Sequence, residues 1–374
     1  MKKKELRSGY TTGTCASVAT YIALSLLLEK DIEKIVKIKS LDGIELDVPV
    51  SSYKKGKNWA RGVVIKDAGD DPDVTNGIEI CAKVKILKEL PNIKRGHYID
   101  NILILGGRGV GLVTKKGLKV EPGKSAINPG PQEMIVKAIK SLVSNDVKVV
   151  TKIYVPQGIE KAKKTFNRKL GVLGGISILG STGIVKPMSE EALTKSMYAE
   201  LKVLKENTTK NWVIFAFGNH GKRFCEENKL NLEHMVVTSN YIGFMIDSAV
   251  ELGFKKVLLV GHIGKAIKVA GGIFNTHSRV ADARLEILAA NAFIMNEKRE
   301  NILKVLESNT AEEACAYIEN KDVFNLICNK VAKRCKEHSR EEIEFQGMMF
   351  TYSGEILGYS DNFYSMVEEL KNES

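Results

Sequence analysis

Alternation of strands and helices in the second half of the chain limits its fold more than any other feature. Short runs rich in valine and isoleucine are followed by segments with apolar residues at helical spacing. We expect strands at 147–155, 176–179, 213–217, 235–238 and 256–260, and helices at 159–170, from about 188, and at 242–252. Parallel strands need helical crossovers, so this alternation predicts a mostly parallel sheet.

The first part of the chain follows a different order. We expect strands at 35–40, 44–50, 62–66, 78–87 and 101–105, and a helix at 131–143. This order is typical of an α+β fold, and 374 residues suffice for two domains. We therefore place an α+β domain at 1–146 and an α/β domain at 147–374. The second domain is expected to end in helices after Ser278 and a hairpin at 343–357.

Glycine and small polar residues follow the predicted strands of the second domain. They form three groups: Gly180, Ser181, Thr182 and Gly183; Gly218 and Asn219; and Gly261, His262, Gly264 and Lys265. Ligands of open α/β sheets bind beyond the carboxyl ends of the strands, and glycine allows close approach to the backbone. Three such groups favour a nucleotide-like ligand. NAD and ATP lack support, because the spacing of neither a dinucleotide fingerprint nor a phosphate loop is present.

Residues 66–77, KDAGDDPDVTNG, crowd four carboxylates into a chain whose formal net charge is +11. They belong to Asp67, Asp70, Asp71 and Asp73. Crowded carboxylates repel one another unless something holds them apart, and the glycine and proline among them predict a shaped loop. Two interpretations are open. Either these side chains cap their own backbone, or one carboxyl has a shifted pKa and serves chemistry.

A predicted buried helix follows a threonine-rich stretch near the start of the chain. The first residues are basic and then apolar, as in a signal peptide, but the polar stretch at 9–14 interrupts that order. We expect a buried helix with Thr14 as its N-cap. Thr11, Thr12 and Thr14 either cap this helix or bind an oxygen-rich ligand. Cys15 is either a stabilised thiolate in the first turn or, as is commoner, a small buried residue.

Two further polar segments are candidates for anion binding. The glycine-rich stretch at 106–111 carries Arg108 and precedes a strand-like segment, so it predicts a hairpin and not the phosphate-binding start of a helix. The segment at 275–284 carries His277, Arg279 and Asp282 at a spacing that suits one helical face. A lone histidine is usually structural, so a structural and a functional role are both open for His277.

The cysteine and charge patterns argue against several classes of protein. The six cysteines form no CxxC pair, which argues against a zinc site and a disulfide framework and fits a reducing cytoplasm. No apolar run has the length of a membrane span. The basic residues are dispersed, without a zinc-finger spacing or an RNA-binding signature, so nucleic acid lacks support as a partner. A polyanionic small molecule suits the net positive charge.

Six motifs together resemble the cobalt-precorrin-5B C(1)-methyltransferase family of anaerobic cobalamin biosynthesis. In chain order they are GYTTGTC (9–15), KDAGDDPDVTNG (66–77), GGRGVGLVTKKGL (106–118), INPGP (127–131), GGISILGSTGIVKPMS (174–189), and VGHIGK with NTHSRVADAR (260–284). The resemblance implies methyl transfer from S-adenosylmethionine to C1 of a cobalt-containing corrinoid, which gives cobalt-precorrin-6A. It implies a Rossmann-like second domain that binds S-adenosylmethionine. The implied substrate carries many acetate and propionate groups and brings its own cobalt, so no protein metal site is expected.

This resemblance suggests roles for the residues singled out above. The three glycine-rich groups would hold the cofactor. The substrate side would be formed by Thr11, Thr12, Thr14, Arg108, Asn128, Lys265 and Arg279. Methyl transfer to carbon depends mostly on positioning, with one tuned group for any proton transfer. The candidates for that group are Asp70, Asp71 and His277, while Asp67 and Asp73 are expected to shape the loop.

Two other classes of function stay open. One is another S-adenosylmethionine- or nucleotide-dependent enzyme that acts on a polyanionic small molecule. The other is a non-catalytic binder of a corrinoid or of nucleic acid. Affinity for S-adenosylhomocysteine supports a transferase, whereas salt-sensitive binding of nucleic acid without cofactor affinity supports a binder.

Overall fold

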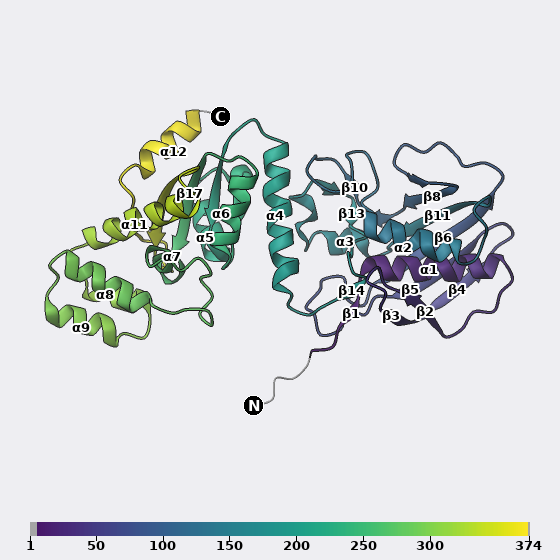
Figure 1. Cartoon of the computed structure of the whole chain (residues 1–374), viewed down its shortest axis with the longest axis horizontal. Coiled ribbons are helices and arrows are strands. Elements are labelled where there is room, and N and C mark those ends of the chain that lie inside the picture. The colour runs from purple at the N-terminus through teal and green to yellow at the C-terminus, as the bar shows by residue number, and fades with distance from the viewer. Residues whose placement is uncertain (1–5, 373–374) are drawn as a thin grey trace. The chain divides into compact units, whose positions relative to one another are not determined.

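A computed structural model describes residues 6–372 of the chain. The chain divides into two compact units, Met1–Glu190 and Glu191–Ser374 (Figure 1). The boundary expected between residues 146 and 147 therefore falls inside the first unit. The reason is strand β11 (Lys148–Tyr154), which lies in the middle of the first sheet and pairs with a neighbour on each side.

A six-stranded mixed sheet forms the centre of the first unit. Its order is β4 (Ser52–Lys55), β5 (Ala60–Ile65), β6 (Glu79–Leu87), β11, β8 (Ile102–Gly106) and β7 (His97–Ile99). All neighbours run antiparallel except β11 and β8, which are parallel. The predicted strands at 35–40 and 44–50 form a separate pair, β2 (Ile35–Lys39) and β3 (Glu45–Pro49).

Helices α1 (Thr12–Leu27) and α2 (Pro129–Lys140) lie together against one face of this sheet (Figure 1). Gly62 of β5 permits the close packing of α1, because a Cβ atom there would lie 2.3 Å from the carbonyl oxygen of Ala19. The N-cap of α1 is Thr11 and not Thr14: the Thr11 Oγ1 atom accepts a hydrogen bond of 3.1 Å from the Thr14 backbone N–H. The helix predicted at 131–143 is confirmed as α2.

Short paired strands complete the first unit. They are β1 (Gly9–Tyr10) with β14 (Ile184–Val185), β9 (Gly109–Val110) with β13 (Gly175–Ile176), and β10 (Leu112–Val113) with β12 (Val172–Leu173). Helix α3 (Gly158–Ala162) and the 3₁₀ turn η1 (Phe166–Arg168) replace the longer helix predicted at 159–170. The strand predicted at 176–179 is thus not part of the parallel sheet of the second unit, because its partner β9 lies in the first.

The second unit contains a five-stranded sheet that is parallel except for its last strand. The order is β16 (Met235–Val237), β15 (Trp212–Ala216), β17 (Lys256–His262), β18 (Glu344–Phe350) and β19 (Ile356–Tyr359). Numbered within the unit, this is the order 2-1-3-4-5 of a doubly wound α/β sheet. Strands β18 and β19 confirm the predicted terminal hairpin.

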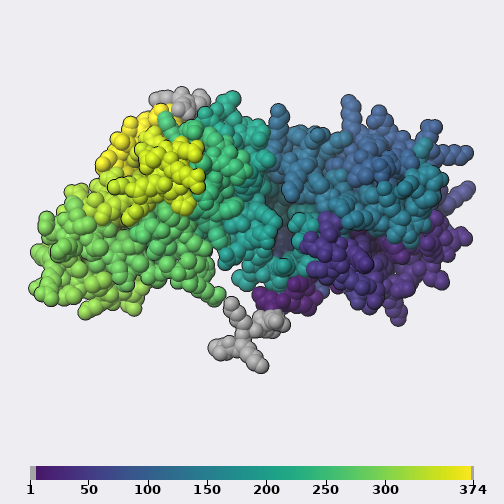
Figure 2. All heavy atoms as spheres, in the orientation of Figure 1, coloured from purple at the N-terminus to yellow at the C-terminus, as the bar shows by residue number. Residues whose placement is uncertain are grey.

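Helices cover both faces of the second sheet. One face packs against α4 (Glu190–Glu206), α6 (Ile242–Glu251), α7 (Ile263–Ala270) and α11 (Asp322–His338). A further group, α8 (Arg284–Ile294), α9 (Arg299–Glu307), α10 (Ala311–Ala314) and η3 (Cys315–Tyr317), packs onto α7 and α11 and onto one another. The other face packs against α5 (Gly218–Glu227) and α12 (Phe363–Asn372), and η2 (Leu232–His234) leads into β16. Alternate strand residues supply the two cores, as the period of a strand requires. Each unit has buried hydrophobic clusters of its own. Figure 2 shows the side chains that cover these elements at the surface.

Two negative findings hold for the part of the chain that the structure describes. Between residues 6 and 372, no helix combines the length and the apolar character needed to cross a membrane. Within the same residues, no group of three or more histidine, cysteine or acidic side chains is arranged to hold a metal ion.

Candidate active site

A cavity of about 330 Å³ lies at the carboxyl ends of the parallel strands of the second unit. Its wall is formed by Phe217, Gly218, Asn219, His220, Asn240, His262, Gly264, Lys265, Lys268, Thr276, His277, Ser278, Arg284 and Tyr352. Two larger hollows lie at the amino ends of the same strands, around Lys255. Ligands of doubly wound sheets bind at the carboxyl ends, so the smaller cavity is the better candidate.

This cavity lies where the winding of the sheet reverses. Neighbouring strands β15 and β17 lead into helices on opposite faces, α5 and α7, which leaves a crevice between their first turns. Gly218 begins α5 with φ +70°, a conformation that favours glycine. A Cβ atom at this position would lie 3.3 Å from the Lys265 Nζ atom. Glycine thus keeps the space beside that ammonium group open.

His262 is held in one tautomer by two neighbours. Its Nδ1 atom accepts a hydrogen bond of 3.1 Å from the Gly264 backbone N–H, which makes His262 the N-cap of α7. The Nε2 atom therefore carries the proton and donates a hydrogen bond of 3.0 Å to the Glu312 carboxylate. Burial lowers the pKa of His262 in spite of this carboxylate. The result is a neutral imidazole of fixed orientation.

Aromatic rings form one side of the cavity. The Tyr352 ring stacks on His262 with centroids 3.8 Å apart, and His220 meets Tyr352 edge-on at 4.8 Å. Glu312 also fixes Tyr352, whose backbone N–H donates to the second carboxylate oxygen at 3.0 Å. One carboxylate therefore orients both rings.

Three basic side chains border the cavity, and they differ in their partners. Lys268 is buried and donates to the backbone oxygens of Thr276 and Ala281. Arg284 makes a two-pronged ion pair with Asp282 at 2.7 Å. Lys265 has no hydrogen-bond or ion-pair partner among residues 6–372, and burial lowers its pKa. Lys265 is thus the cation that can meet an anionic group of a ligand.

The segment before α8 brings only some of its predicted residues to the cavity. His277 lines it, and its Nδ1 atom accepts a hydrogen bond of 3.1 Å from the Arg279 backbone N–H. Arg279 itself is exposed and does not line the cavity. The shared helical face expected for His277, Arg279 and Asp282 is wrong, because α8 begins only at Arg284 and the preceding residues form a turn.

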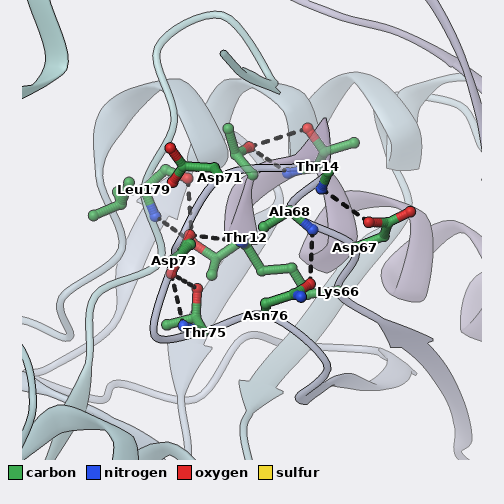
Figure 3. Close-up of polar contacts among 12 residues, drawn as sticks. Thr12, Thr14, Lys66, Asp67, Ala68, Asp71, Asp73, Thr75, Asn76 and Leu179 are labelled. Carbon is green, nitrogen blue, oxygen red and sulfur yellow. Dashed lines mark hydrogen bonds and ion pairs between the residues drawn. The ribbon is translucent and has the colours of Figure 1, made fainter. Parts of the chain in front are cut away.

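The acidic loop of the first unit is held together by its own carboxylates (Figure 3). Asp73 accepts hydrogen bonds from the Lys66 ammonium group at 2.7 Å and from the Thr75 N–H and hydroxyl at 2.6 Å. Lys66 is 1% exposed. Burial raises the pKa of Asp73, but its hydrogen bonds with Lys66 and Thr75 outweigh that effect, and the net shift is downward. This pair, in which Lys66 is buried and Asp73 is partly exposed, anchors the loop.

The other three carboxylates of this loop also have partners. Asp67 accepts two hydrogen bonds from the Arg7 guanidinium, which lower its pKa, and a third from the Gly69 N–H. Asp70 accepts from the Arg7 backbone N–H at 2.8 Å, and Asp71 accepts from the Met188 N–H at 2.9 Å. Asp67 and Asp73 shape the loop, as expected, but Asp70 and Asp71 help to do so as well.

The threonines predicted to bind substrate are buried and paired within the chain. Thr11 caps α1, Thr12 exchanges hydrogen bonds with the backbone of Leu179, and Thr14 donates to the Gly183 carbonyl oxygen at 2.6 Å. The stretch Gly180–Gly183 therefore lies against the start of α1. The three glycine-rich groups expected at one sheet edge are divided, since only two follow strands of the second sheet.

The remaining predicted residues have separate positions. Arg108 is exposed on the glycine-rich loop, and Asn128 is the N-cap residue of α2. Gly261 lies inside β17, where a Cβ atom would come within 2.8 Å of the Phe217 ring, so its role there is packing. Cys15 is fully buried, and burial raises its thiol pKa to about 12, which confirms the structural interpretation.

Sequence reasoning missed Tyr352, which belongs to the aromatic wall, and Glu312, which orients that wall. Tyr352 follows β18, which lies parallel to β17. The polar turn at 351–354 therefore lies at the carboxyl edge of the sheet, and the rule for strand ends would have indicated it as part of the site. Glu312 comes from the short helix α10 and has no sequence signal of its own. Only the tertiary fold brings it to His262.

A ligand cavity at the switch point of a doubly wound sheet defines an α/β ligand-binding protein. Comparison with known proteins is more specific. The CbiD family model matches residues 1–187, and the CbiD C-terminal domain model matches residues 275–361. The chain belongs to the CbiD family.

Similar proteins include two cobalt-precorrin-5B C(1)-methyltransferases. The one from Fusobacterium nucleatum is 55% identical over 370 residues, which cover 99% of each chain. The one from Methanocaldococcus jannaschii is 44% identical over 360 residues, 95% of this chain and 97% of that one. A solved structure of a cobalamin biosynthesis protein from Archaeoglobus fulgidus is 29% identical, with a TM-score of 0.37, and the match covers 75% of this chain and 84% of that chain.

Proposed function

We propose that this chain methylates C1 of cobalt-precorrin-5B, with S-adenosylmethionine as the methyl donor, and so forms cobalt-precorrin-6A. Family membership and the names of its relatives support the reaction. The observation that carries the cofactor assignment is the cavity beside Gly218 and Lys265 at the switch point of the second sheet.

The cavity residues fit the chemical groups of S-adenosylmethionine. Lys265, without a partner of its own among the described residues, suits the carboxylate of the methionyl part. Asn219 and Asn240 offer amide groups to ribose hydroxyls, and the wall of His262 and Tyr352 offers a flat surface to the adenine. The cofactor supplies an electrophilic methyl group on a cationic sulfur. Aromatic faces and oxygen lone pairs stabilise a cation of this kind.

The tasks of the protein are positioning and control of protons. Because Gly264 and Glu312 fix His262, the imidazole keeps its Nε2 proton and holds the aromatic wall in place without adding positive charge near a sulfonium. Asp70, Asp71 and His277 are the proposed groups for proton transfer. Arg108 and Asn128 are proposed for the substrate side, together with the stretch Gly180–Gly183. The buried Thr12 and Thr14 hold that stretch and the adjacent Leu179 through hydrogen bonds to the backbone.

Anaerobic incubation with cobalt-precorrin-5B and methyl-labelled S-adenosylmethionine tests the reaction. We expect label in the corrinoid and tight binding of S-adenosylhomocysteine by calorimetry. Single-turnover rates of Asp70→Asn, Asp71→Asn and His277→Ala then test the proton-transfer role, where loss of a general base slows the step about a hundredfold or more. Unchanged rates in all three variants would remove these residues from the mechanism. Absence of label with the unmodified chain would overturn the proposed function.

A further inference from the structure

A row of four cations crosses the sheet of the first unit. Lys54 on β4 lies opposite Arg61 on β5, Arg61 lies opposite Lys83 on β6, and Lys83 lies opposite Lys152 on β11. Neighbouring strands are about 4.8 Å apart, so the row is roughly 14 Å long. Like charges directly opposite one another destabilise a sheet. This arrangement therefore weakens the fold unless an anion lies against it.

The row lies on the face of the sheet that α1 and α2 leave open. Gly62 packs against α1, so the adjacent Arg61 points to the opposite face, and its cross-strand partners share that direction. Lys54 and Lys152 are exposed, and Arg61 and Lys83 are half-buried.

Several carboxylates of the first unit are paired with cations outside the row. Ion pairs join Glu29 to Lys55, Asp73 to Lys66 and Asp100 to Lys140. In the described part of the chain, no member of the row has a carboxylate partner. The acidic residue of β6 on this face, Glu79, lies at the end of the strand opposite Ile65.

Flat apolar groups border the cations. The Lys83 ammonium group lies 4.1 Å from the centroid of the Trp59 ring. On the other side of the row, Tyr154 lies opposite the buried Cys81. The Arg61 Nε atom is buried and has no hydrogen-bond partner among residues 6–372. This surface combines a short line of positive charge with aromatic rings at its edges.

We propose that this open face binds the corrinoid substrate through its carboxylates. The inference rests on the proposed function, which makes the substrate a macrocycle with many acetate and propionate groups. A flat polycarboxylate matches both the cations and the rings of this face. The row ends at β11, because the next position, Leu105 on β8, lies under an apolar cluster with Leu90 and Ile93. A short, bounded row suits a small molecule better than a nucleic-acid duplex, which needs a longer track of cations.

The test compares two double variants that lose the same charge. Lys83→Gln/Lys152→Gln removes two directly opposed members of the row. Lys34→Gln/Lys119→Gln removes two exposed lysines of the same unit that lie elsewhere. We expect the first variant to raise the KM for cobalt-precorrin-5B roughly tenfold, with kcat and the KM for S-adenosylmethionine within about twofold. The control variant should match the unmodified protein.

Direct binding and stability complete the experiment. Absorbance titration with cobalt uroporphyrin, a planar polycarboxylate, should show the same roughly tenfold loss, and a cobalt porphyrin with cationic substituents should not bind at this face. The thermal midpoint of Lys83→Gln/Lys152→Gln should stay unchanged or rise, because two opposed like charges are removed. A misfolded variant would instead have a lower midpoint. Weaker binding with an unchanged or higher midpoint therefore reports a loss of binding groups.

Three outcomes overturn the proposal. They are an unchanged corrinoid KM, an equal loss in the control variant, or competition in which single-stranded DNA or anionic vesicles displace the porphyrin while the KM is unaffected. Each of these leaves methyl transfer intact, so it is distinguishable from failure of the proposed function, in which no label reaches the corrinoid in any variant.

Discussion

The acidic loop of the first unit and the cavity of the second unit differ in where their polar groups point. In the loop, all four carboxylates accept hydrogen bonds from the chain itself, and Asp73 also neutralises the buried Lys66. In the cavity, Glu312 and the Gly264 N–H fix the His262 ring, while Lys265 is left without a partner among the described residues. The loop gives each carboxylate an internal partner, whereas the cavity leaves a cation available to a ligand.

This difference shows when a cluster of ionisable residues in a sequence indicates a binding site and when it indicates a structural loop. A dense cluster of ionisable residues attracts attention in a sequence, yet its density is explained by loop geometry when each group has an internal partner. An isolated cation in a cavity is less conspicuous in sequence and better suited to binding. The two regions should therefore respond to substitution in opposite ways, in stability for the loop and in affinity for the cavity.

The largest expected effect is on stability, from Asp73→Asn. This substitution leaves the buried Lys66 ammonium group without its counter-charge, and breaking a buried pair in this way costs about 3 kcal/mol. Chemical denaturation followed by the fluorescence of Trp59, in a Trp212→Phe background, measures the first unit. The control is Asp71→Asn, which loses part of one hydrogen bond at the surface and should cost less than about 1 kcal/mol. Equal losses in the two variants would contradict the folding role assigned to Asp73.

The next effect is on affinity, from Lys265→Ala. A hydrogen bond to a charged ligand group is worth about 2 kcal/mol, so the Kd for S-adenosylhomocysteine should rise roughly thirtyfold. The free energy of unfolding should change little, because Lys265 has no partner to lose among residues 6–372. Calorimetry with Lys222→Ala as the control, a surface lysine of α5 that pairs with Glu226, separates a local effect from a change in net charge. A loss of stability without a loss of affinity would mean that Lys265 stabilises the fold, as the loop carboxylates do, and does not bind the ligand.

Much of the fold was predictable from periodicity. Strands β15, β16 and β17, helix α6 and the hairpin of β18 and β19 all follow the expected pattern, because valine- and isoleucine-rich runs and helical spacing are local properties of the sequence. The domain boundary was not predictable in this way. Strand β11 has the same local pattern as the later strands, but its partners β6 and β8 come earlier in the chain, and pairing is not a local property.

The candidate site was predictable only in part, for the same reason. Gly218 and Lys265 follow strands and His262 ends β17, and the rule for strand ends found them. Glu312 and Tyr352 reach His262 from segments far along the chain, so only the tertiary fold identifies them. At Gly180–Gly183 the same rule predicted a cofactor site that is not at the edge of the second sheet. The Gly183 carbonyl oxygen there accepts hydrogen bonds from Thr11 and Thr14 at the start of α1.

The smallest expected effect concerns pH and compares the two tryptophans, one in each unit. Trp212 stacks on His234 with ring centroids 4.5 Å apart, whereas Trp59 lies beside Lys83. Burial lowers the pKa of His234 below its ordinary value of 6.5. The unfolded chain therefore takes up a proton at higher pH than the folded chain. The contribution of His234 to stability is fully present above about pH 6.5 and decreases as the pH falls toward the lower pKa of the folded state.

Fluorescence of single-tryptophan variants measures this titration directly. With Trp59→Phe, we expect the emission of Trp212 to change with a midpoint below pH 6.5, because a charged imidazolium replaces the neutral ring stacked on the indole. With Trp212→Phe, the emission of Trp59 should show no step in that range, since Lys83 keeps its charge there. Adding His234→Gln to the first variant should abolish the step. A midpoint above pH 6.5 would mean that His234 is stabilised in its charged form. In that case a charged His234 would stabilise the fold of the second unit, as the carboxylates of the acidic loop stabilise the first. The contrast between the two regions would then apply to the cavity alone and not to the whole second unit.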